Sequence, residues 1–135
     1  MDTQRFSQRQ QDLLRAAARL QEAVSQPVDS GILRDATIQR FEFTFEIAWK
    51  AMQGYLLHQG IEVAGPRQTL KQAFVAGLIA TSEAADIWLA MLDDRNLTTH
   101  TYREALAESI VAHIRQRYAS QLYDMADRVA KLTLD

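Results

Sequence analysis

The chain has 135 residues, the length of one ordinary domain, and a domain of this size buries roughly two-thirds of the surface of its unfolded chain. Hydrophobic residues make up 47% and charged residues 24% of the sequence, which excludes disorder and fibrous repeats. The absence of cysteine excludes disulfides, thiol nucleophiles and thiolate metal sites. A formal net charge of -2 provides no overall positive field for nucleic acid, so any RNA site must be local.

Residues 1–135 are expected to form one domain. No apolar run approaches the roughly 20 residues that a bilayer crossing requires, and the polar residues 1–11 do not resemble a signal peptide. Glycine-rich phosphate loops and paired metal-ligating histidines are also absent from the sequence. We therefore expect a cytoplasmic protein with no membrane segment, no metal and no cofactor.

Apolar residues recur at three- and four-residue steps, which is the spacing of one face of an α-helix. Residues 3–25 form the first predicted helix, residues 26–31 a loop, and residues 33–59 a second helix. The second helix is apolar around much of its circumference, which predicts a central position or a subunit contact. The predicted inward residues are Phe6, Leu13, Ala17, Leu20 and Val24 in the first helix, and Ile38, Phe41, Phe45, Ala48, Met52 and Leu56 in the second.

Three further helices follow. The Gly-Pro pair at residues 65–66 predicts a helix that ends near Gly77, and residues 81–82 predict the start of the next. Thr101 and Glu104 fit a capping box, so the last helix is predicted to begin at Thr101. Because no convincing two-residue alternation is present, the predicted fold is all-α: an antiparallel bundle of about five helices in one domain.

The stretch before the last helix carries the candidate site. If that helix begins at Thr101, then Arg95 closes the fourth helix or opens the connection, His100 lies just before the cap and Tyr102 occupies the first turn. The N–H groups at such a helix start attract phosphate. An Arg, the polar Asn96 and a His could cleave a phosphodiester without metal. The imidazole would exchange a proton with the attacking 2′-hydroxyl or the leaving oxygen, and the guanidinium would hold the phosphate.

One imidazole does not readily serve as both base and acid in a single displacement, and a two-fold dimer would supply a second Arg95 and a second His100. A simpler interpretation stays open, in which Arg95 is a solvated cation and His100 is a capping or core-edge imidazole. In that interpretation Tyr102 is a packing residue with a solvent-exposed hydroxyl. His58 and His113 are expected to be surface or edge residues without a role.

The motif RNLTTHTY at residues 95–102 has an Arg, four residues, a His, one residue and a Tyr. It resembles the signature of HepT-type toxins in the HEPN superfamily of ribonucleases. The resemblance covers roughly residues 40–118 and includes RFEFTFEIAWK at 40–50, PR at 66–67, KQAF at 71–74, GLI at 77–79 and WLAML at 88–92. Together these segments resemble nucleotidyltransferase substrate-binding subunits, which share the HepT fold.

The resemblance implies a homodimer whose two Arg–His corners face each other and cleave RNA without metal, as the toxin of a type VII-like toxin-antitoxin pair. It implies that Arg95 and His100 are the catalytic pair and that Asn96 is a supporting polar residue. It also implies a partner, a small antitoxin nucleotidyltransferase that transfers AMP to Tyr102. An adenylate there would place an anion over the arginines and obstruct the RNA phosphate.

The long second helix has a charged pattern with two interpretations. Glu42, Glu46 and Lys50 lie at four-residue steps, which fits a charged stripe with a Glu46–Lys50 pair beside a buried face. Alternatively, these charges form the dimer or partner contact together with Phe43 and Trp49, because large aromatic residues are enriched in interface cores.

Three functions remain open from the sequence. They are an RNA endonuclease toxin silenced by AMPylation, a non-catalytic substrate-binding subunit of a two-component nucleotidyltransferase, and a purely structural helical oligomer. Arg67 and Lys71 form a solvated face, or they extend the surface that contacts RNA or the nucleotidyltransferase. Metal-independent RNA cleavage that is lost in His100→Ala distinguishes the first function from the other two.

Overall fold

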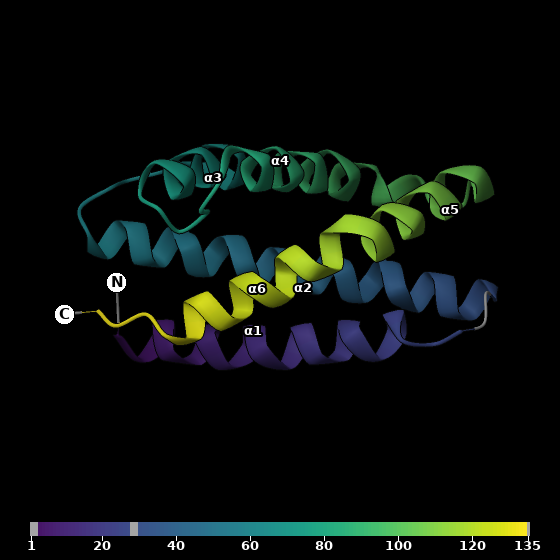
Figure 1. The fold of residues 1–135 in the computed structure, drawn as a ribbon, viewed down its shortest axis with the longest axis horizontal. Helices are drawn as coiled ribbons and strands as arrows, with labels where there is room; N and C mark the ends of the chain where they lie inside the picture. Colours follow the sequence, from purple (N-terminus) through teal and green to yellow (C-terminus); the bar gives the residue numbers. More distant parts are fainter. Residues whose placement is uncertain (1–2, 28–29, 135) are drawn as a thin grey trace.

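The computed structural model describes residues 3–27 and 30–134, and every regular element in those residues is helical. The α5, η2 and α6 segments follow one another directly and form one bent rod (Figure 1). The described residues therefore form five helical rods, and the predicted all-α bundle of about five helices is confirmed. In chain order the elements are α1 (Thr3–Val24), α2 (Gly31–His58), α3 (Gly65–Val75), α4 (Ser82–Leu97), the 3-10 turn η1 (Thr98–His100), α5 (Glu104–His113), the π-turn η2 (Ile114–Tyr118) and α6 (Ala119–Ala130).

Helix α2 lies at the centre of the bundle and packs against α1, α3, α5 and α6. All the inward residues predicted for it are buried, and those of α1 are buried apart from Val24, which is half-buried while Ala23 is buried beside it. The ring of Phe41 stacks on that of Tyr118 at 5.6 Å, and the ring of Phe45 lies 6.0 Å from that of Trp88. The aromatic core thus joins α2 to η2 and to α4.

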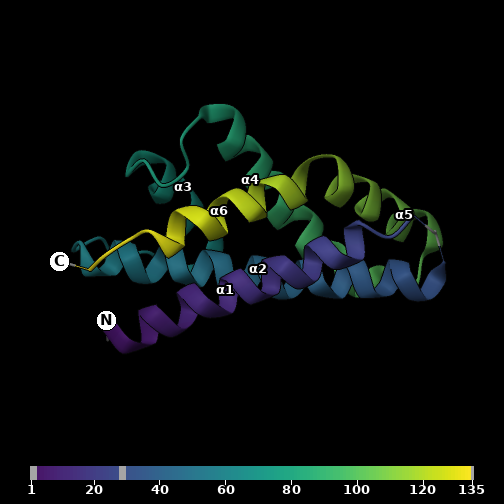
Figure 2. The same ribbon diagram turned by 60° about the horizontal axis from the view of Figure 1, so that its bottom comes forward.

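The chain runs back and forth along the bundle, so α1 begins and α6 ends at the same end of the molecule (Figure 2). The side-chain amide of Gln10 fastens the two segments there by donating to the carbonyl oxygens of Val129 at 2.7 Å and Leu132 at 3.0 Å. The junction of α4 and α5 lies at the opposite end (Figure 1).

Helix α2 begins at Gly31, two residues before the predicted start, because the Ser30 hydroxyl accepts a hydrogen bond from the Leu33 N–H at 3.1 Å and caps the helix. Residues 28 and 29 of the predicted loop lie outside the described residues. Helices α2 and α3 are each followed by a glycine with positive φ, 85° at Gly60 and 86° at Gly77. This conformation closes a helix and suits glycine, which has no Cβ.

The last rod begins at Glu104, so the prediction that it begins with a capping box at Thr101 was wrong. The Thr101 hydroxyl donates instead to the carbonyl of Thr98, at 3.0 Å. Carbonyl groups at the end of a helix have no partner in the helix itself, and threonine hydroxyls can serve them. Thr101 therefore belongs to the turn that ends α4, and Arg103 takes the position before α5 without a side-chain cap.

The π-turn η2 was not predicted, although the spacing of apolar residues carries a signal for it. Leu106, Ile110, Ile114, Tyr118 and Leu122 are all four residues apart. In a straight α-helix, with about 3.6 residues per turn, such a series drifts around the axis. The wider π-turn takes up the extra residue, and the last four members of the series are all buried.

Candidate active site

The predicted site residues lie at the junction of α4 and α5, and the turn that carries them is held by its own hydrogen bonds. The hydroxyl of Thr98 donates to the carbonyl of Arg95 at 2.7 Å. The N–H of Arg103 donates to the carbonyl of His100 at 3.0 Å. Because Thr98 is also buried, the position of His100 is fixed relative to the end of α4.

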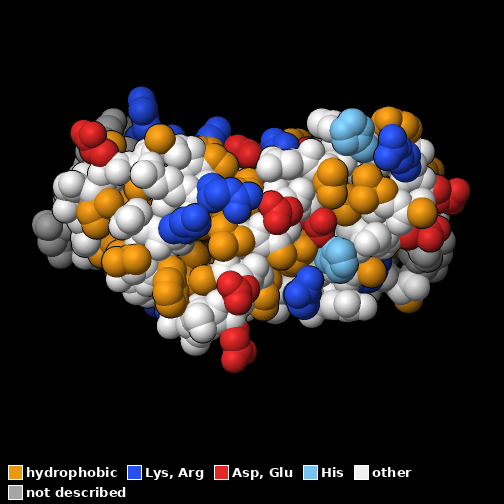
Figure 3. Space-filling view, turned by 90° about the horizontal axis from the view of Figure 1, so that it is seen from above, with side chains coloured by type: hydrophobic (Ala, Val, Ile, Leu, Met, Phe, Trp, Pro, Cys, Tyr) orange, Lys and Arg blue, Asp and Glu red, His pale blue; other side chains and the backbone are white. Residues whose placement is uncertain are grey.

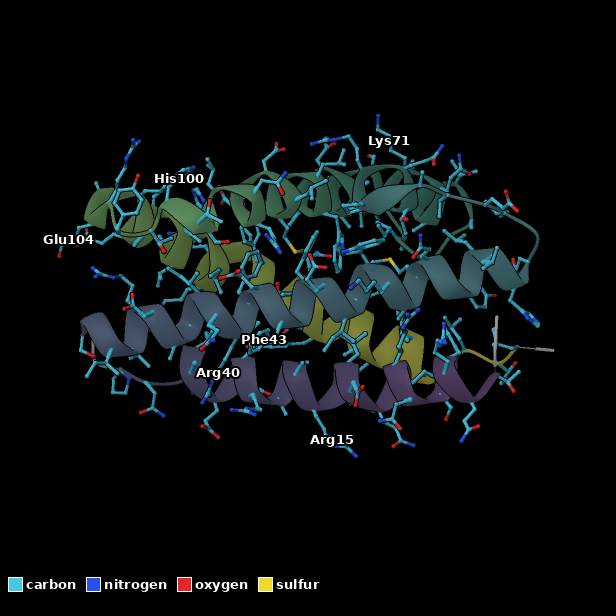
Figure 4. All side chains as sticks on the ribbon, turned by 180° about the vertical axis from the view of Figure 1, so that it is seen from behind. Arg15, Arg40, Phe43, Lys71, His100 and Glu104 are labelled. Carbon is cyan, nitrogen blue, oxygen red and sulfur yellow. The ribbon has the colours of Figure 1, made fainter. Side chains whose placement is uncertain are left out.

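His100 and Tyr102 lie next to each other on the surface. Their ring centroids are 6.0 Å apart and the rings meet edge to face at 73°. The Arg103 guanidinium lies 5.9 Å from the centre of the Tyr102 ring. Tyr102 is 76% exposed, so its hydroxyl is accessible to a modifying enzyme. Figure 4 shows His100 on the outer side of the bundle, at the end where Glu104 begins α5.

Arg95 lies in the last turn of α4, as predicted, and is oriented by a residue of α2. Its Nε donates to Glu46 Oε1 at 3.2 Å, and the two side chains are 29% and 33% exposed. The other oxygen of Glu46 accepts from Trp49 Nε1 at 3.2 Å and lies 3.8 Å from Lys50 Nζ. The Glu46–Lys50 pair is confirmed, and Glu46 has the further effect of holding Nε of Arg95. This leaves the two Nη groups of Arg95 as the donors that can bind a phosphate.

The last turn of α4 is tied to three neighbouring elements by three consecutive side chains. Asp93 pairs with Arg67 of α3 at 2.9 Å, Asp94 bonds to the α5–η2 segment, and Arg95 bonds to Glu46 of α2. Consecutive residues of a helix lie about 100° apart around its axis, which is why each of the three reaches a different neighbour. Arg67 is therefore an ion-pair partner within the protein, and a contact of Arg67 and Lys71 with RNA stays a prediction.

Asp94 is the centre of a polar cluster that the sequence did not reveal. Its Oδ2 accepts a hydrogen bond from the Tyr118 hydroxyl at 2.7 Å and lies 2.7 Å from Nδ1 of His113. Burial, reinforced by this hydrogen bond to Asp94, raises the pKa of Tyr118 far above its ordinary value. His113 was expected to be a surface or edge residue without a role; it is half-buried and bound to Asp94. His58 is exposed at the end of α2, as expected.

The junction therefore brings together His100 and Tyr102, and it places Arg95 against α2. Asn96 is exposed on the last turn of α4. The expected attraction of phosphate assumed a helix start at Thr101, and that position was wrong because the helix begins at Glu104. The Glu104 carboxylate at this helix start is paired with Arg34, at 3.4 Å from its Nη1.

The surrounding surface has no single sign of charge. Seen from above (Figure 3), the face over α3, α4 and α5 carries basic and acidic side chains interspersed with apolar ones, and histidines lie toward the α5 end. Recognition of a phosphate on this face must therefore depend on a few positioned groups. In residues 3–27 and 30–134, no three His, Asp or Glu side chains gather as a metal site would require. No helix of those residues combines the length and apolar character needed to span a bilayer.

Phe43, one of the predicted contact residues, is 57% exposed. It lines a groove between α1 and α2 whose rim includes Arg15 and Arg40 (Figure 4). Trp49 is half-buried. A role of this face in a dimer or partner contact stays a prediction.

The fold and the site define a class: an antiparallel helical bundle with an arginine at the end of its fourth rod and an adjacent His–Tyr pair on the turn that leads to the fifth. The family described as nucleotidyltransferase substrate binding protein like matches residues 8–131. This chain belongs to that family, and the predicted resemblance is confirmed.

Two similar proteins are informative. The chain is 34% identical over 82 residues to a protein of Haemophilus influenzae described as probable ribonuclease HepT. The match covers 57% of this chain and 54% of that protein, so the chain spans about half the length of this curated relative. A crystal structure of a Thermus thermophilus protein is 40% identical, with a TM-score of 0.81 over 88% of this chain and 99% of that one.

Proposed function

We propose that this protein is a metal-independent RNA endonuclease, the toxin of a toxin-antitoxin pair, and that a partner nucleotidyltransferase silences it by transferring AMP to Tyr102. The observation that carries the proposal is the junction itself. An exposed imidazole lies beside an exposed phenol, on a rigid turn that follows an arginine whose Nη groups are available. The similarity to a probable ribonuclease HepT supports the same function.

The proposed reaction is an internal displacement in RNA. The 2′-oxygen attacks phosphorus and the bond to the 5′-oxygen breaks, which leaves a 2′,3′-cyclic phosphate and a 5′-hydroxyl. A His100 imidazole accepts the proton of the 2′-hydroxyl, and a second His100 from the partner protomer donates a proton to the leaving oxygen. The Nη groups of Arg95 hold the phosphate oxygens as negative charge develops on them, and Asn96 supports their position.

The first test is cleavage of a mixed RNA substrate in the presence of a chelator. The wild-type protein is expected to cleave. His100→Ala should lower the rate by about a hundredfold to ten-thousandfold, because that is what general acid–base catalysis typically contributes. His58→Ala is a matched control, because it removes an exposed histidine at the opposite end of the bundle. Cleavage by His100→Ala at the wild-type rate would remove His100 from the mechanism.

The second test concerns the modification. Incubation with the partner nucleotidyltransferase, ATP and magnesium should add one or more AMP groups, which intact mass detects and peptide mapping assigns to Tyr102. The modified protein should no longer cleave RNA, because the added phosphate repels the substrate phosphate from the same corner. Tyr102→Phe should escape modification and keep its nuclease activity. AMP found only at another residue would contradict the proposed switch.

A second candidate function is a non-catalytic subunit that binds substrate for a separate nucleotidyltransferase, and the description of the family favours it. This function predicts a stable complex with the enzyme, no RNA cleavage, and a complex that His100→Ala leaves unchanged. The chelator-resistant cleavage assay separates the two candidates directly.

A further inference from the structure

We infer that His113 and Tyr118 are positioning residues of the same site, which act through Asp94 to hold Arg95 in the orientation that binds phosphate. The inference rests on the proposed function of Arg95 and adds to it a cluster on a different rod of the bundle. Both side chains contact one oxygen of Asp94 at 2.7 Å, and Asp94 directly precedes Arg95 in the chain.

The π-turn is what allows two residues of one rod to meet at a single carboxylate. His113 and Tyr118 are five residues apart. In an α-helix, residues five apart point about 140° away from each other. Hydrogen bonds of the i to i+5 type widen the turn and bring such residues toward the same side. Here the two rings lie 5.9 Å apart and both reach Asp94. The wide turn thus builds the cluster, and π-turns occur frequently at functional sites.

The cluster is well placed to control Arg95 because Asp94 is more deeply anchored than its acidic neighbour in the last turn of α4. Its side chain is 14% exposed, whereas that of Asp93 is 67% exposed. A carboxylate removed from water needs its hydrogen bonds to remain there. Loss of a donor would let the last turn of α4 rotate or fray, and the hydrogen bond of Arg95 to Glu46 would weaken with it.

The test measures the Arg95 guanidinium itself. In the full-length ¹⁵N-labelled protein, the Nε–H signal of Arg95, assigned with Arg95→Lys, reports its hydrogen bond to Glu46. Tyr118→Phe removes one donor to Asp94 and His113→Ala removes the other. Both variants should shift this signal and speed the exchange of the Nε–H proton with solvent. Both should also lower kcat for RNA cleavage by about tenfold, because a small misplacement of a binding group costs this much or more in rate.

Two control variants separate positioning from a general loss of structure. Tyr123→Phe makes the same chemical change on α6, where the buried hydroxyl has no hydrogen-bond partner among the described residues, and should leave the Arg95 signal and kcat unchanged. His113→Asn replaces the imidazole N–H with an amide N–H that can still donate to Asp94, and should restore both toward wild type.

The outcomes are distinct. An unchanged Arg95 signal in folded Tyr118→Phe and His113→Ala overturns the inference. If Tyr118→Phe does not fold, the comparison of His113→Ala with His113→Asn decides, because the half-buried His113 tolerates substitution better. If the wild-type protein cleaves no RNA, the proposed function fails, whereas the Arg95 signal still decides whether the cluster positions this side chain.

Discussion

At the scale of single residues, Tyr118 links the aromatic core to the candidate site, and its ionisation predicts how stability depends on pH. Its folded-state pKa is raised by burial and by the hydrogen bond to Asp94, whereas an unfolded tyrosine ionises at about pH 10. The stabilisation that the protonated Tyr118 gives the folded state is therefore fully present below about pH 10 and is lost as the pH rises toward the folded-state pKa. Above about pH 10, Tyr118 should lower the free energy of unfolding by up to about 1.4 kcal/mol per pH unit.

Urea unfolding over the alkaline range measures this slope. In Tyr118→Phe the free energy of unfolding should fall less steeply with pH than in the wild-type protein. Burial also raises the pKa of Tyr123, so Tyr123→Phe should flatten the decline as well, and the double variant should flatten it most. Equal slopes in the wild-type protein and Tyr118→Phe would contradict the assignment.

The residue scale is also where prediction from sequence was least complete. Arg95, His100 and Tyr102 could be selected because they lie within eight residues of one another, but their partners could not. Glu46 is 49 positions away from Arg95, and no local pattern reports such a contact. His113 looked like a surface residue because its partner Asp94 belongs to another rod, and side-chain contacts between rods depend on packing geometry.

At the scale of the elements, periodicity predicted the rods, and turn chemistry decided their ends. The predicted helix starts near residues 65–66 and 81–82 were correct because glycine, proline and a capping threonine act locally. The start at Thr101 was wrong because the same threonine can cap the helix that follows or serve a carbonyl of the helix before it. Sequence spacing alone does not choose between these uses.

The two ends of α4 provide a matched pair of threonines for a prediction about this element. Thr81 caps the first turn by accepting from the Ala84 N–H at 3.0 Å, and Thr98 donates to the Arg95 carbonyl at 2.7 Å. Thr81→Ala and Thr98→Ala should each lower the free energy of unfolding by about 1 kcal/mol. Only Thr98→Ala should also slow RNA cleavage, because only Thr98 supports the turn that carries His100. Denaturant unfolding and the cleavage assay, run on both variants, check this. Equal cleavage rates in Thr98→Ala and Thr81→Ala would show that the turn does not need the Thr98 hydroxyl.

At the scale of the whole molecule, the proposed reaction requires two copies of the chain. Arg95 is bonded to α2 and His100 is exposed on the following turn, so a site that uses both arginines and both histidines has to form between protomers. Mixing wild-type chains with His100→Ala, which is inactive alone, should lower cleavage by more than the share of variant chains, because a mixed dimer keeps one His100 and the reaction needs two. His100→Ala leaves the hydrogen bonds that hold the turn in place, so its circular dichroism should match that of the wild-type protein.

A rate that falls only in proportion to the share of variant chains, when mass spectrometry shows that mixed dimers have formed, would mean that each protomer works alone or that the geometry differs from the proposed one. The same experiment repeated at several protein concentrations gives the expected signature of a shared site, a rate per chain that rises as dimers form.

The arrangement of the rods also has a practical consequence. Because α1 starts and α6 finishes at one end of the bundle and the junction lies at the other (Figures 1 and 2), an affinity tag or fluorescent reporter fused before α1 or after α6 would lie away from the junction. Chains captured on a sensor surface through such a tag would present His100 and Tyr102 outward, where the binding of the proposed RNA substrate and of the proposed partner can be measured.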